Sequence, residues 1–282
     1  MSSKKDKFSS KDRNYMKLAL NLARARKGLT GDNPSVGCVI VKNDEIISIG
    51  QTGLHGRPHA ETIAIKNSFQ SLKGSIMYVT LEPCNHYGKT PPCTNKIIKS
   101  GINKVFYSIN DIDNKVRGKS FEILSKNNIS VKKGLLKIEA QKLYDSYFFN
   151  RKKKLPFVTA KIAISKNKII YSEGTKRITD KFSDTLSHFL RFKNDAIMVS
   201  STTVNTDNPR LDCRLEGFEN YSPKRVIIDK NLEINLNSYI LKSVKKNNTI
   251  IFYNSTNISK LKILKKKKIK LIKLKLDNNK NF

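Results

Sequence analysis

Three residues of the kinds that bind zinc stand in order in the N-terminal half of the chain: His59, Cys84 and Cys93. Together with Glu61 they form the pattern H-x-E followed by P-C-x8-C. Zinc binds neutral imidazole nitrogen and thiolate sulfur, and three such ligands leave the fourth tetrahedral position open to water. The metal makes water a nucleophile near neutral pH, and a carboxylate beside it can carry a proton to a leaving nitrogen. The pattern therefore predicts a hydrolytic zinc site, with Glu61 as the proton carrier.

The two cysteines admit other uses. A disulfide between them would need an oxidising compartment, and a redox pair normally has C-x-x-C spacing. A structural zinc site would need a fourth protein ligand, for which His86 is the candidate, two residues after Cys84. Cys38 lies in an apolar run and is expected in the core. The catalytic interpretation is favoured because the complete set, with its order and spacing, is more specific than any one member.

The local sequence is expected to hold these ligands firmly. His59 and Cys93 stand where helices are expected to begin, over 60–69 and 93–99, and Cys84 follows a strand expected at 75–81. Proline precedes each of the three residues, and its ring fixes the backbone just before the ligand. The N-terminus of a helix carries positive potential, which stabilises a thiolate.

Hydrophobic periodicity places these segments in a larger domain. The other expected elements are helices at 11–27, 119–128 and 136–150 and strands at 104–109 and 129–134. The run 36–50 indicates two strands joined by a turn at Asn43-Asp44. Strands separated by helices predict an α/β fold with a mainly parallel sheet and helices on its faces. Residues 1–10 are expected to be a disordered tail, and 11–150 to form the first domain.

A second domain is expected at 155–282. The basic run RKKK (151–154) before Leu155-Pro156 indicates the boundary. Beyond it, strands are expected at 157–164, 195–200, 224–229 and near 268–275, with a helix around 180–192. The last forty residues are low in complexity and rich in lysine and isoleucine, so we do not expect them to complete a folded domain well.

The pattern H-A-E with P-C and a second cysteine resembles the zinc-dependent cytidine/deoxycytidylate-type deaminases. Four segments further resemble the deaminase half of the bifunctional riboflavin-biosynthesis deaminase/reductase family: "DNPSVGCVIV" (32–41), "RPHAE" (57–61), "YVTLEPC" (78–84) and "GKTPPC" (88–93). The resemblance covers residues 11–150 and implies a three-layer cytidine-deaminase-like domain. It also implies zinc-dependent removal of an exocyclic amine from 2,5-diamino-6-(5-phosphoribosylamino)pyrimidin-4-one.

The resemblance extends to substrate-binding positions in this domain. Asn33 would hydrogen-bond the polar edge of the pyrimidine, although its place before proline is equally consistent with a turn residue. Lys89, in the loop between the two cysteines, would meet the substrate phosphate, and His86 would line the same pocket. Asp111 opens the loop "DIDNKVRGK" (111–119), which is similar to the family's D-P-N-P-x-V-x-G loop, and would contact the substrate.

The second half resembles the reductase half of the same family in the segments "FVTAKIAISKNKI" (157–169), "GTKRIT" (174–179) and "LRFKNDAIMVSSTTVNTDNPRLDCR" (190–214). This resemblance implies a dihydrofolate-reductase-like α/β domain that uses NADPH. The implied cofactor contacts are Ala163, Arg177, Thr203 and Asp207. The implied contacts to the phosphoribosyl substrate are Thr175, Arg191, Leu211 and Arg214. The family's later Gly-rich segment has no counterpart after Lys230, so we expect an incomplete domain, with its C-terminal part missing and little reductase activity.

The net charge of +32 comes from 44 Lys and 11 Arg against 23 acidic residues. Such a charge is typical of nucleic-acid binding, and a tRNA or DNA base deaminase is the alternative function. Against it stand the long loop between the cysteines, the reductase-like segments and the preference for Lys, which lacks the planar fork that Arg presents to phosphates. A non-enzymatic zinc-binding protein is a third possibility.

The sequence also bears on location. No apolar run approaches the roughly 18 residues that cross a bilayer, and the basic N-terminus lacks the apolar core of a secretory signal. We therefore expect a cytoplasmic enzyme with a small-molecule substrate and neither a membrane nor a nucleic-acid partner. The sequence is compatible with both a monomer and a homo-oligomer.

Overall fold

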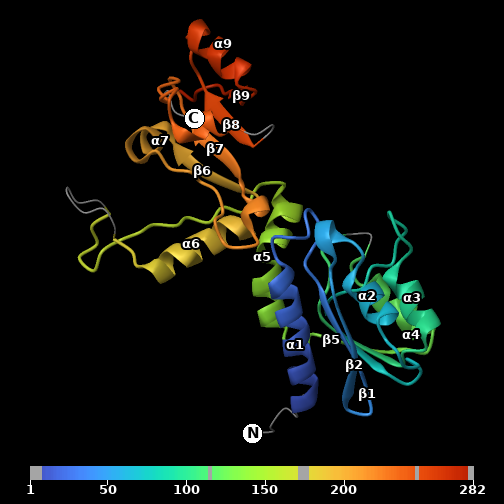
Figure 1. The fold of residues 1–282 in the computed structure, drawn as a ribbon. Helices are drawn as coiled ribbons and strands as arrows, with labels where there is room; N and C mark the ends of the chain where they lie inside the picture. The colour runs from blue at the N-terminus through green and yellow to red at the C-terminus, as the bar shows by residue number, and fades with distance from the viewer. Residues whose placement is uncertain (1–7, 114–115, 171–177, 245–247, 279–282) are drawn as a thin grey trace. The chain divides into compact units, whose positions relative to one another are not determined.

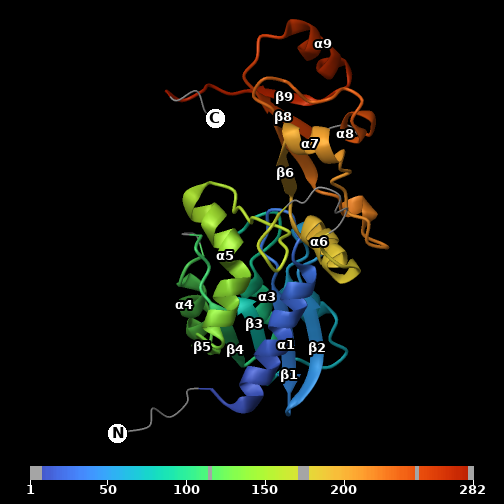
Figure 2. The same cartoon turned by 90° about the vertical axis from the view of Figure 1, so that its left-hand side faces the viewer.

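The computed structural model describes residues 8–113, 116–170, 178–244 and 248–278. The chain divides into two compact units, Met1–Ala160 and Lys161–Phe282, which Figure 1 and Figure 2 show from two directions. Each unit has its own sheet and its own hydrophobic core.

The N-terminal unit is built on a five-stranded sheet with the order β2-β1-β3-β4-β5. Its strands are β1 (Gly37–Lys42), β2 (Glu45–Gln51), β3 (Ile76–Leu81), β4 (Lys104–Ile109) and β5 (Ser130–Lys133). β1 runs antiparallel to β2 and β3, whereas β3, β4 and β5 are mutually parallel. The expected mainly parallel sheet is therefore mixed, because the hairpin turn at Asn43 and Asp44, both with positive φ, adds an antiparallel side.

Helices cover both faces of this sheet (Figure 1), as a three-layer fold requires. α1 (Ser10–Arg26) and α5 (Lys137–Lys153) lie together on one face, and α2 (Ala60–Lys66), α3 (Cys93–Ser100) and α4 (Lys119–Lys126) lie on the other. A single-turn 3-10 helix, η1 (Leu54–Gly56), precedes α2. α1 buries Met16, Ala19, Leu20 and Ala23, which share one helical face. The predicted three-layer cytidine-deaminase-like arrangement is confirmed.

α1 begins at Ser10, earlier than the sequence predicts. The Ser9 side chain accepts the backbone N–H of Asp12, and the Asp12 carboxylate accepts the N–H of Ser9, which is a capping box. The Tyr78 hydroxyl also donates to Asp12 at 2.7 Å. Partial burial opposes ionisation, but the Tyr78 and Ser9 hydrogen bonds hold the pKa of Asp12 below its usual value. Phe8 packs against the core, so residues 8–10 belong to the folded unit.

The basic run 151–154 is the end of a helix rather than a linker. α5 continues to Lys153, and Lys154 closes it with a positive φ of 59° and an N–H donated to the Asn150 carbonyl. Lysine and arginine are favourable in the last turn because they interact with the negative end of the helix dipole. The same composition that indicates a domain boundary therefore also suits a helix terminus.

The C-terminal unit has a four-stranded parallel sheet with the order β6-β7-β8-β9. Its strands are β6 (Ala196–Ser200), β7 (Lys224–Ile228), β8 (Thr249–Tyr253) and β9 (Lys270–Lys273). Its helices are α6 (Lys181–Lys193), α7 (Ser201–Asp207), α8 (Tyr239–Lys242) and α9 (Ile258–Lys266), with a 3-10 turn η2 (Glu219–Tyr221). The strand expected near 268–275 is confirmed as β9. The lysine-rich end folds because Leu264 and Ile269 are buried while most of its lysines face water.

The strand predicted at 157–164 is wrong. Within the described residues this segment belongs to neither sheet, and Val158 and Ile162 are each 70% exposed. An apolar run makes a segment capable of pairing, but a strand also needs a hydrogen-bonded neighbour. The turn after it does form: the N–H of Lys168 donates to the Ser165 carbonyl at 2.9 Å. Lys168 takes a positive φ of 64°.

Candidate metal centre

His59, Cys84 and Cys93 converge on one point in the N-terminal unit. Nδ1 of His59 lies 3.3 Å from Sγ of Cys93 and 3.5 Å from Sγ of Cys84, and the candidate ligand atoms all lie within 4.8 Å of one another. Tetrahedral zinc with ordinary bond lengths separates its nitrogen and sulfur ligands by about 3.6 Å. The three side chains therefore fit a zinc ion with one position left open.

The elements place these ligands as the sequence predicts. His59 is the N-cap of α2, and Cys93 is the first residue of α3 after Pro92. Cys84 follows β3, and its carbonyl accepts the backbone N–H of Thr94 at 3.1 Å. The backbone N–H of Cys93 donates to the Cys84 sulfur at 3.3 Å. The first turn of α3 thus directs an N–H at the sulfur of Cys84, as helix N-termini do for anions.

The two thiols are unequal in the protein without metal. Hydrogen bonds from the Cys93 thiol and from His59 lower the pKa of Cys84. The thiol that donates, Cys93, has its pKa raised by that contact and by burial. A pair of this kind gives up its protons in linked steps. Because metal ligation requires thiolates, zinc binding would release the proton that Cys93 retains.

Glu61 is buried beside this cluster. Its side chain is in the first turn of α2 and the residue is 4% exposed. Burial raises the pKa of Glu61, and its carboxyl interacts with His59 and with the Cys93 thiol. A buried carboxyl whose pKa is raised can hold a proton near neutral pH, which is what a proton carrier in hydrolysis must do.

The structure gathers two of the expected substrate residues around the loops that lead to the ligands. A Cβ added to Gly56 would lie 2.1 Å from Nδ2 of Asn33, so Asn33 packs directly on the turn before His59. Nδ1 of His86 is buried, and among the described residues no partner lies within hydrogen-bond distance of it. A polar atom of this kind suits a pocket that receives a polar ligand.

The other two substrate residues differ in burial. Lys89 is exposed in the loop between the thiols, where a point charge can meet a phosphate. Asp111 is 8% exposed, and its Oδ1 accepts the backbone N–H of Asp113 at 3.0 Å. Burial raises the pKa of Asp111, and the backbone hydrogen bonds from Asp113 and Ile112 oppose the rise.

Glu82 holds the loop of Asp111 in place, a role that the sequence does not reveal. Its Oε2 accepts the backbone N–H groups of Asp111 and Gly118 at 3.3 and 3.0 Å, and its Oε1 accepts that of Ser120 at 3.2 Å. The residue is 3% exposed. Its only signal in the sequence is an acidic residue directly after an apolar strand, two positions before a ligand.

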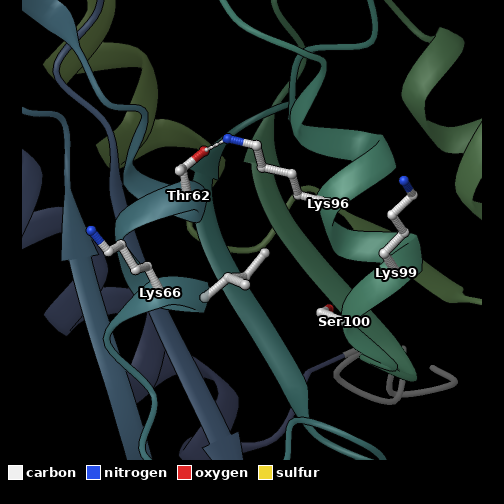
Figure 3. A pocket seen from close by; sticks show the side chains of 6 residues that line it. Thr62, Lys66, Lys96, Lys99 and Ser100 are labelled. Atoms are coloured by element: carbon white, nitrogen blue, oxygen red, sulfur yellow. Dashed lines mark hydrogen bonds between the residues drawn. The ribbon is translucent and has the colours of Figure 1, made fainter.

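A separate groove runs between α2 and α3 (Figure 3). It is lined by Thr62, Ile65, Lys66, Lys96, Lys99 and Ser100. Nζ of Lys96 donates to the Thr62 hydroxyl at 3.0 Å across it. None of the predicted site residues lines this groove, so it is distinct from the metal centre.

In the C-terminal unit the structure brings three predicted substrate residues together. Nη1 of Arg191 donates to the Asp212 carbonyl at 3.1 Å, and Nη1 of Arg214 lies 2.7 Å from the Asp212 carboxylate. Leu211, 5% exposed, is next to Asp212 in sequence. Arg191 belongs to the last turn of α6 and Arg214 to the segment after α7, and two guanidinium groups that meet at one residue can bind a phosphate group.

The predicted cofactor residues of this unit are spread over different segments. Thr203 and Asp207 lie on α7, whose N-cap Ser200 accepts the Thr203 N–H at 3.1 Å. Ala163 lies in the segment 157–164, outside the sheet. Thr175 and Arg177 lie outside the described residues. α7 follows β6 directly, and the carboxyl ends of parallel strands are where such sheets bind ligands.

No helix in the described part of the chain is both long enough and apolar enough to cross a membrane.

Two family models match the chain. Residues 9–109 match the cytidine and deoxycytidylate deaminase zinc-binding region, and residues 156–279 match the RibD C-terminal domain. The second match gives no support to the expectation that the reductase-like domain is truncated. The first match covers the metal centre, so the deaminase domain is of a zinc-binding kind.

Individual relatives agree with both matches. The riboflavin biosynthesis protein RibD of Aquifex aeolicus is 38% identical over 273 residues, which is 96% of this chain and 76% of that protein. The diaminohydroxyphosphoribosylamino-pyrimidine deaminase of Buchnera aphidicola (subsp. Schizaphis graminum) is 48% identical over 141 residues, 50% of this chain and 95% of that protein. The chain spans smaller shares of other RibD relatives, for example 60% of the Bacillus amyloliquefaciens protein.

Solved structures lead to the same family. The diaminohydroxyphosphoribosylaminopyrimidine deaminase/5-amino-6-(5-phosphoribosylamino)uracil reductase of Thermotoga maritima is 32% identical, with a TM-score of 0.79, over 94% of this chain and 81% of that one. The RibD of Acinetobacter baumannii is 29% identical, with a TM-score of 0.81, over 94% and 74%. The chain belongs to the RibD family of riboflavin-biosynthesis deaminase/reductases, with a zinc deaminase domain followed by a reductase domain of the NADPH-using kind.

Proposed function

We propose that the N-terminal unit removes the exocyclic amine of 2,5-diamino-6-(5-phosphoribosylamino)pyrimidin-4-one by hydrolysis. The observation that carries this proposal is the convergence of His59, Cys84 and Cys93 beside the buried carboxyl of Glu61. Bound zinc supplies Lewis acidity that makes water nucleophilic near neutral pH. The three side chains would hold the ion, and among the described residues no fourth His, Cys, Asp or Glu joins the group.

Glu61 carries the proton in this mechanism. Its carboxylate takes a proton from the attacking water as the oxygen bonds to the ring carbon, and delivers it to the adjacent ring nitrogen. It then takes the remaining proton of the new hydroxyl group and delivers it to the amine nitrogen, which leaves as ammonia. The products are thus a ring carbonyl and ammonia, and no other reactant is consumed. The burial of Glu61 keeps bulk water from competing for that proton.

Four residues are proposed to bind the substrate: Asn33, His86, Lys89 and Asp111. For Asn33 the support is its packing on the turn before His59, and for His86 it is the unpartnered, buried Nδ1 on the loop between Cys84 and Cys93. Lys89 is placed to meet the phosphate, since it is exposed on the loop between the thiols. The name of the Buchnera relative, a diaminohydroxyphosphoribosylamino-pyrimidine deaminase, supports this choice of substrate.

The C-terminal unit is proposed to reduce the deaminated product with NADPH. Ala163, Arg177, Thr203 and Asp207 would hold the cofactor. Thr175, Arg191, Leu211 and Arg214 would hold the phosphoribosyl group, and the meeting of Arg191 and Arg214 at Asp212 supports a phosphate site. The proposed domains are 11–150 and 155–282, and the proposed location is the cytoplasm.

The test is the zinc content of the purified protein together with ammonia release from the diaminopyrimidine ribotide. Glu61→Gln should retain zinc and lose at least about 99% of deamination, because an amide cannot accept the proton. A variant that keeps more than a few per cent of wild-type turnover would exclude the proton-carrier role. Light scattering of the same sample tests for a homo-oligomer.

The charge of +32 keeps a nucleic-acid base deaminase as the second candidate. The same ammonia assay with tRNA and single-stranded DNA separates the two. Turnover of the ribotide alone supports the first proposal, and turnover of a nucleic acid alone supports the second. Binding to RNA that falls steeply with salt, without turnover, would reflect only the general charge.

A further inference from the structure

The last turn of α5 places Arg151 among residues of the deaminase site. Its Nη2 donates a hydrogen bond to the backbone carbonyl of Asp32 at 2.8 Å. Asp32 directly precedes Asn33, which is proposed to bind the substrate. The contact joins two residues 119 positions apart in sequence, so it fastens the Asn33 loop to the end of a helix.

Tyr147, one turn earlier on α5, orients the guanidinium group. The Cζ atom of Arg151 lies 5.4 Å from the centre of the Tyr147 ring, within the range of a cation–π contact. Arg can lie against an aromatic ring and still donate N–H groups from its edge, whereas Lys has no planar group to do both. The Asp32 carbonyl and the Tyr147 ring are thus two contacts of the same exposed side chain.

The charge of Arg151 also acts on Asp111. Asp111 interacts electrostatically with both Arg151 and Tyr147, and the N–H of Asp111 donates to Glu82. The positive charge of Arg151 favours the ionised Asp111 carboxylate. One side chain thus contacts the Asn33 loop and influences Asp111, the two loops that carry proposed substrate contacts.

We propose that Arg151 is a positioning residue of the deaminase site, which fastens the Asn33 loop to the last turn of α5. This inference rests on the proposed deaminase function. The chain supplies a matched control, because Lys152 is the next residue of the same helical turn, carries the same charge and is exposed. Both Arg151→Ala and Lys152→Ala therefore remove one positive charge, but only Arg151→Ala also removes the contact with Asp32.

The experiment compares Arg151→Ala, Arg151→Lys and Lys152→Ala in the zinc-loaded full chain. Arg151→Ala should raise KM for the ribotide about tenfold and leave kcat within about twofold, because it disturbs substrate placement and not proton transfer. Arg151→Lys should give an intermediate KM, since it restores the charge but not the fork. Lys152→Ala should leave both constants within about twofold of wild type.

Hydrogen exchange of the backbone amides in residues 29–36 supplies a readout that does not depend on turnover. Exchange there should be faster in Arg151→Ala than in wild type or Lys152→Ala, because the loop has lost its attachment. Equal KM and equal exchange in the two alanine variants would overturn the proposal, and so would a loss confined to kcat. If Arg151→Ala fails to fold, Arg151→Lys decides by the same two measurements. If wild type releases no ammonia, the proposed function fails, while the exchange data still decide the role of Arg151.

Discussion

Replacing Glu82 tests whether a buried carboxylate holds the substrate loop. The carboxylate accepts three backbone N–H groups, two on Oε2 and one on Oε1. Glu82→Ala leaves the buried N–H groups of Asp111 and Ser120 without an acceptor, at about 1–3 kcal/mol each, and the part-buried N–H of Gly118 loses its acceptor as well. The upper limit of about 6 kcal/mol for the two buried groups is comparable with the whole stability of a domain, about 5–15 kcal/mol. Alanine should therefore unfold the unit or open the loop to water.

Glu82→Gln is the more informative variant because it retains the shape. Its amide oxygen can take the place of Oε2 and keep the bonds from Asp111 and Gly118. Its NH2 group then faces the N–H of Ser120, so that one bond is lost and two donors oppose each other. We expect a loss of about 1–3 kcal/mol in the free energy of unfolding and a raised KM, because the Asp111 loop shifts.

The assay is urea unfolding of the zinc-loaded protein together with steady-state ammonia release. Glu122→Gln is the matched control, since it removes an exposed carboxylate from the first turn of α4, where it is worth only a few tenths of a kcal/mol. The reasoning about Glu82 is refuted if both glutamine variants unfold at the same urea concentration and have the same KM.

Two further changes have definite expected outcomes. Cys84→Ser should abolish zinc binding and deamination together, because removing one thiolate from a three-ligand site removes most of its affinity for zinc. Metal analysis checks this, and the control is Cys213→Ser in the other unit, which should keep its zinc. Asp12→Asn should lower the free energy of unfolding by about 1 kcal/mol at pH 7. Since the native pKa of Asp12 is lowered, its contribution is complete above the unfolded pKa of about 3.9 and is lost as pH falls through the native value. Unfolding curves of the two proteins should therefore converge in acid, and a constant difference down to pH 2 would contradict the argument.

The metal centre could be predicted from sequence because its signals are local. Each ligand follows a proline, and His59 and Cys93 stand at helix starts that the apolar pattern predicts. Most strands and helices of the N-terminal unit were predictable for the same reason, since periodicity reports which face of an element is buried. The basic run 151–154, which indicates a domain boundary in the sequence, forms the end of α5, because lysine and arginine suit a boundary and a helix C-terminus alike.

The attachments around the site depended on tertiary structure. Glu82 accepts hydrogen bonds from Gly118 and Ser120, which lie 36 and 38 positions away in the sequence. Arg151 donates to Asp32, which lies 119 positions away. No residue near Glu82 or Arg151 in the sequence indicates which distant residue its side chain contacts. The segment 157–164 shows the converse, since its apolar run suits a strand but the described residues give it no neighbouring strand. The sequence by itself determined the chemistry and the local elements, because residue types and their spacing carry that information. Only packing between distant segments decided which side chains hold the site in place.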